Sequence, residues 1–92
     1  MGKDIVELIF IRKELIKQKN NAHAMLKKLY EMKITGITEE INITEEETRV
    51  RRNLVLVNRC INLCDKLMRK PNNAKLEIEL QKTYDEVTTH FD

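Results

Sequence analysis

The 92-residue sequence has no Trp, one Pro, two Gly and two Cys. Two glycines cannot supply a phosphate-cradling loop. Two cysteines do not make a disulfide framework, so we expect an intracellular protein, nuclear or cytoplasmic. No apolar run approaches the roughly 18 residues of a membrane span, and we expect no membrane partner. Two Tyr and two Phe are too few for recognition of single-stranded nucleic acid by base stacking.

The composition is 41% hydrophobic and 35% charged, with Lys and Glu abundant and a net charge of +2. Lys and Glu favour helices, and helix breakers are scarce. A chain of this length forms one domain, here residues 1–92. The mild net charge argues against a nucleic-acid-binding protein.

The spacing of apolar residues predicts an all-α fold, a compact bundle of four main helices. We expect a fifth short helical turn at 38–42, and we expect the second helix to lie at the centre of the bundle. A strand through "VELIFI" is the competing interpretation of the first helix, whose apolar face is broad enough to be central or to contact a partner. The four main helices are expected at 4–19, 21–33, 45–69 and 74–90.

Residues that cap or interrupt helices suggest these boundaries. The polar run Lys17–Asn21 interrupts the apolar pattern and predicts a loop. Gly36 suits a helix C-cap, and Pro71 ends the third helix. Capping boxes are expected at Asp4 with Glu7 and at Thr44 with Glu47, and Asn72 or Asn73 is expected to cap the last helix.

Cys60 and Cys64 lie four residues apart in "RCINLCDK". A CxxC redox motif has two intervening residues, and a zinc site needs two further ligands. His23 and His90 do not form a metal-binding spacing with this pair. We therefore interpret the cysteines as core residues, with a redox role as the alternative. We expect no enzyme activity, no metal and no cofactor.

The segment "NNAHAMLKKLYEMKIT" and the final "LMRKPNNAKLEIELQKTYDEVTTHF" resemble parts of one family. This family is the N-terminal domain of the transcription factor TFIIS, and in particular the LEDGF-type integrase-binding domain. In that domain a helix with the pattern Leu-x-x-Leu leads into Val-Thr, matched here by Leu26, Leu29, Ile34 and Thr35. The acidic residue with which the family grips partners has no counterpart in Lys17–Asn21, so the ligand is expected to differ.

The resemblance implies a non-catalytic protein–protein interaction module, an adaptor in transcription or chromatin regulation, that docks a short motif of a disordered partner between interhelical loops. Loop lysines favour a motif with acidic and apolar residues. We expect the partner-binding residues to be Lys17, Lys19, Asn20, Asn21, Lys70, Asn72 and Asn73.

Three alternatives remain at this stage. In the first alternative, the chain is a structural or assembly subunit, or a homodimer, whose partner covers the first helix. "RVRRNLVLVNRCINLCDKL" is similar to the last helix of BAG domains, which bind seventy-kilodalton heat-shock chaperones. Arg51, Arg52 and Arg59 would be the contacts of a weak nucleic-acid binder.

Overall fold

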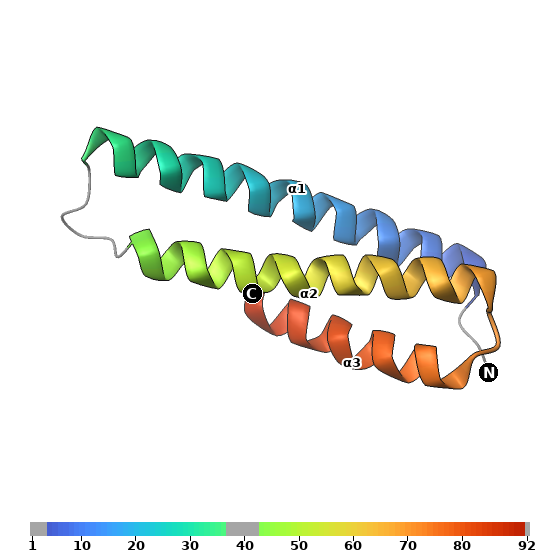
Figure 1. Cartoon of the computed structure of the whole chain (residues 1–92). Coiled ribbons are helices and arrows are strands. Elements are labelled where there is room, and N and C mark those ends of the chain that lie inside the picture. Colours follow the sequence, from blue (N-terminus) through green and yellow to red (C-terminus); the bar gives the residue numbers. More distant parts are fainter. Residues whose placement is uncertain (1–3, 37–42, 92) are drawn as a thin grey trace.

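The structure is a computed structural model that describes residues 4–36 and 43–91, with side chains as far as Val87. It contains three helices: α1 (Ile5–Thr35), α2 (Ile43–Arg69) and α3 (Ala74–Phe91) (Figure 1). The predicted all-α fold is confirmed, and the described residues contain no strand. The predicted number of main helices is wrong, because the expected helices 4–19 and 21–33 are one. The expected turn at 38–42 lies outside the described residues.

Helix α1 continues through the polar run that we expected to be a loop. Leu8, Leu15, Ala22 and Leu29 are all buried and are spaced seven residues apart. Seven residues are two helical turns in a supercoiled pair, so these side chains form one continuous stripe. The run Lys17–Asn21 contains no Gly or Pro, and its Lys and Gln residues favour a helix. Nothing local therefore interrupts the stripe.

The ends of α1 match two sequence predictions in part. Gly36 is the C-cap with φ 76°, in the left-handed region, and its N–H donates to the carbonyl of Met32. Glycine reaches this conformation at no steric cost, so the predicted cap is confirmed. Asp4 is the N-cap residue in an extended conformation, but its side chain makes no capping hydrogen bond.

Helix α2 begins at Ile43, two residues before the predicted start. Thr44 therefore lies inside the first turn, and the predicted capping box at Thr44 is wrong. Its carbonyl instead accepts a hydrogen bond of 2.9 Å from the Thr48 hydroxyl. Ile43 is buried in a cluster with Leu29 and Val50, so an apolar contact stabilises the two additional residues of the helix.

Helices α2 and α3 are joined by a short turn around Pro71. The Asn73 side-chain oxygen accepts a hydrogen bond of 3.2 Å from the N–H of Leu76. This bond satisfies one of the unpaired amides at the start of α3, as predicted for Asn73.

Helix α2 lies at the centre of the bundle, and the prediction that residues 21–33 would be central is wrong. Both α1 and α3 pack on α2, whereas no described Cα atom of α1 lies within 8 Å of one in α3. Two buried series with seven-residue spacing let α2 contact both helices. They are Ile43, Val50, Val57 and Cys64, and Asn53, Cys60 and Leu67.

The molecule is elongated, with extents of 52 × 18 × 17 Å. Helix α3 returns along α2 from the Pro71 turn and ends well before the first turn of α2 (Figure 1). One end of the bundle therefore has three helices around a large apolar cluster, and the other end has only α1 and α2 around a smaller one. Within residues 4–36 and 43–91, no helix combines the length and apolar character needed to cross a membrane.

Candidate interaction surface

Cys60 and Cys64 are free thiols, fully buried in the core between α2 and its neighbours. The prediction that they are core residues is confirmed. Burial, followed by the neighbouring Cys64 and Glu86, raises the pKa of Cys60 to about 12. The Cys60 thiol is therefore protonated at neutral pH, and a thiol reacts far more slowly than a thiolate.

The described residues contain no group of three or more His, Cys, Asp or Glu side chains that could hold a metal ion. His23 is exposed on α1, and the side chain of His90 lies outside the described part.

The residues predicted to bind a partner do not meet on one surface. Lys17, Lys19, Asn20 and Asn21 lie in the middle of α1 and not in a loop, and Lys19 is half-buried. Asn73 caps α3, while Lys70 and Asn72 are exposed in the turn between α2 and α3. Arg12 of α1 bonds Asp65 of α2, so the turn at Lys70 lies level with the first turns of α1. Lys17 is then about 15 Å away along the helix axis.

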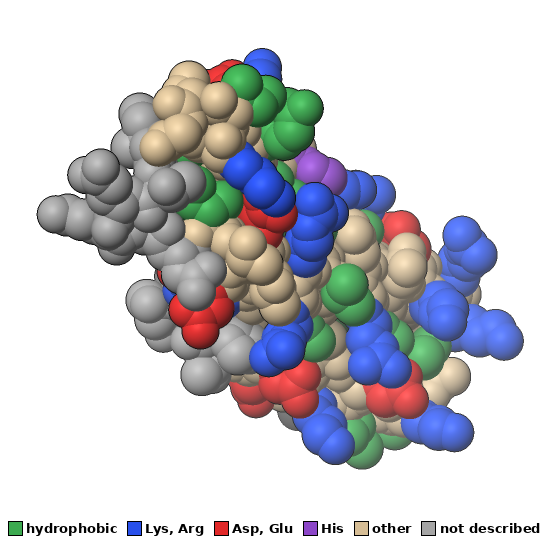
Figure 2. Space-filling view, turned by 60° about the vertical axis from the view of Figure 1, so that its left-hand side comes forward, with side chains coloured by type: hydrophobic (Ala, Val, Ile, Leu, Met, Phe, Trp, Pro, Cys, Tyr) green, Lys and Arg blue, Asp and Glu red, His purple; other side chains and the backbone are tan. Residues whose placement is uncertain are grey.

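The alternative nucleic-acid contacts are exposed on α2 but do not form an extended basic surface. Arg52 and Arg59 are seven residues apart and share a face, whereas Arg51 lies on another side of the helix. Arg49 bonds Glu46 at 2.8 Å, and Arg52 lines an open hollow together with Glu45 and Glu46. Lys and Arg side chains in Figure 2 are interspersed with Asp and Glu. Such a mixed surface is typical of a solvated helix face.

The first two turns of α1 expose large apolar side chains. Val6 is 70% and Phe10 is 73% exposed, and Ile5 and Ile9 are about half exposed. Single exposed apolar residues are common, but four of them on two neighbouring turns form a patch. The breadth of this apolar face is visible in the sequence, which is why a partner on the first helix was one of the alternatives.

A groove of about 540 Å³ lies between this part of α1 and the middle of α3. The α3 wall consists of Gln81 and Tyr84. The backbones of α1 and α3 do not approach each other within 8 Å, so side chains of the two helices form the walls of the groove. The α1 wall consists of Asp4, Val6, Glu7, Phe10 and Ile11.

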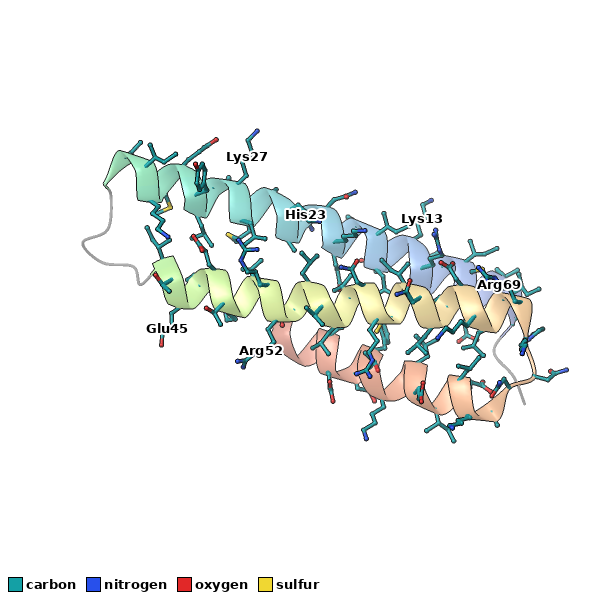
Figure 3. The ribbon with its side chains drawn as sticks, in the orientation of Figure 1. Lys13, His23, Lys27, Glu45, Arg52 and Arg69 are labelled. Atoms are coloured by element: carbon teal, nitrogen blue, oxygen red, sulfur yellow. The ribbon has the colours of Figure 1, made fainter. Side chains whose placement is uncertain are left out.

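A second hollow of about 430 Å³ adjoins the groove at Phe10 and follows α1 toward its middle. Lys13 and Lys17 line it, one helical turn apart. Figure 3 shows Lys13 projecting from α1 on the side away from α2. The groove and this hollow together therefore have acidic side chains at one end and apolar ones in the middle, and at the other end Glu14 lies between the two lysines.

We call this combined surface the α1–α3 face, with Val6, Phe10, Lys13, Lys17, Gln81 and Tyr84 as its main residues. It includes Lys17 and Asn20 from the sequence prediction. The prediction missed Lys13, Gln81 and Tyr84, because nothing in the local sequence shows that α3 folds back beside α1.

Comparisons of the chain with protein-family models, with curated proteins and with solved structures found no match. The resemblance to the TFIIS N-terminal domain, and the weaker one to BAG domains, therefore stay predictions.

Proposed function

We propose that this protein is a non-catalytic protein–protein interaction module and that the α1–α3 face binds a segment of another protein. The observation that carries the proposal is the exposure of Phe10, at 73%, on the rim of a groove. Burying a Phe side chain contributes about 1.5–3 kcal/mol. A partner that covers Phe10 therefore gains a large apolar contact at one position.

The surrounding residues support the same proposal. Val6 and Phe10 are exposed beside a recess, so a partner can cover the protruding side chains and fill the groove together. Aromatic anchors in a recess with a polar rim are typical of the central residues of protein interfaces. Lys13, Glu14 and Lys17 supply the polar rim at one end of the face.

The expected short motif with acidic and apolar residues fits this face as well as it fits the expected loops. Lys17 and Asn20 belong to both surfaces. The apolar side chains of the motif would contact Val6 and Phe10 on this face. A role in transcription or chromatin rests only on the family resemblance and stays a prediction.

The test is affinity capture from a native extract with the whole chain as bait, followed by mass spectrometry. Val6→Ser with Phe10→Ser should remove a stoichiometric partner that the unchanged chain retains. The matched control is Val55→Ser on α2, because Val55 is similarly exposed, at 67%, but lies outside the groove. The control should retain the partner. A partner that is equally retained by all three baits would show that the α1–α3 face is not the binding surface.

A further inference from the structure

We draw no further inference here: the strongest candidate, the α1–α3 face with the exposed Phe10 at its groove, carries nothing beyond the proposed function, because both carboxylates and lysines line it and nothing in the structure shows what covers it.

Discussion

Arg12 of α1 donates a hydrogen bond from its Nε to the Asp65 Oδ1 of α2, over 2.8 Å. The two residues are 53 positions apart in the chain and belong to the two helices that form the long hairpin. The bond fixes which turn of α1 lies beside which turn of α2. Both side chains are more than a third exposed, so water and salt screen their attraction.

The coupling between Arg12 and Asp65 should therefore be modest. A double-mutant cycle with Arg12→Ala and Asp65→Ala should give a coupling free energy of about 0.5–1 kcal/mol in urea unfolding. The coupling should fall as salt is added. Exchanging the charges, with Arg12→Asp and Asp65→Arg together, should recover part of the loss. A coupling of zero at low salt would mean that this pair does not contribute to the register of the hairpin.

Proline at Asn20 tests the continuity of α1. Asn20 is exposed in the middle of the helix, so Asn20→Pro removes a backbone hydrogen bond without disturbing the core. It should lower the free energy of unfolding by about 3 kcal/mol or more. Asn20→Ala, the control, should instead raise it by a few tenths of a kcal/mol. If Asn20→Pro had no effect, residues 17–21 would form a loop, as the sequence pattern predicted.

Asn53 is 4% exposed, and its side-chain oxygen has no hydrogen-bond partner among the described residues. A buried polar atom without a partner lowers stability. Asn53→Leu should therefore raise the free energy of unfolding by about 1–2 kcal/mol in chemical denaturation. Asn62→Leu is the control, because Asn62 is exposed on the same helix and should change stability little. A loss of stability in Asn53→Leu would indicate that Asn53 does have a partner in solution.

The raised pKa of Cys60 predicts how stability changes in alkaline solution. The thiol has a pKa of about 12 in the folded chain and a model value of 9.0. Above pH 9 the unfolded chain therefore loses this proton while the folded chain keeps it. The contribution of Cys60 to stability is complete below pH 9 and falls by at most about 1.4 kcal/mol per pH unit above it.

Comparison with Cys60→Ala isolates this effect from the titration of lysines and tyrosines. The difference in the free energy of unfolding between the two chains, measured from pH 8 to pH 10.5, should be constant below pH 9 and shrink above it. In the same buffers a thiol reagent should modify the unchanged chain slowly until denaturant is added. Rapid modification at pH 8 without denaturant would show that the thiols are accessible.

The sequence predicts the helices and several of their ends because these depend on nearby residues. Gly36 and Asn73 act as caps through their own backbone or side chain, and both were predicted. Thr44 was not a cap, because the apolar contact of Ile43 with a distant helix extends α2 by two residues. Caps are thus predictable only where no tertiary contact competes with them.

The polar run in α1 led to the error in the number of helices. Polarity over five consecutive residues predicts a loop, although the run contains no helix breaker. The seven-residue spacing from Leu8 to Leu29 passes through it and is the better indicator. From Leu15 to Ala22 the buried stripe continues across the five polar residues 17–21.

The α1–α3 face was predictable only on its α1 side. Val6 and Phe10 are each two residues from Leu8 and so lie on the side of α1 opposite the buried stripe. This excess of apolar residues already indicated a central helix or a partner. Tyr84 fits the apolar spacing of α3 and gave no sign that it would line a groove. Its position depends on how α3 packs on α2, which local spacing does not determine.

The central position of α2 also has a consequence for folding. Because α1 and α3 each contact only α2, every helix–helix contact joins neighbours in the chain. Such a topology has low contact order, and domains of this kind fold in microseconds to milliseconds. On the ribosome the hairpin of α1 and α2 emerges first, and the side of α2 that Leu80 and Val87 later cover stays open until α3 follows. Cys60 and Leu67 are then the residues of a nascent chain that are most exposed to aggregation or to a chaperone.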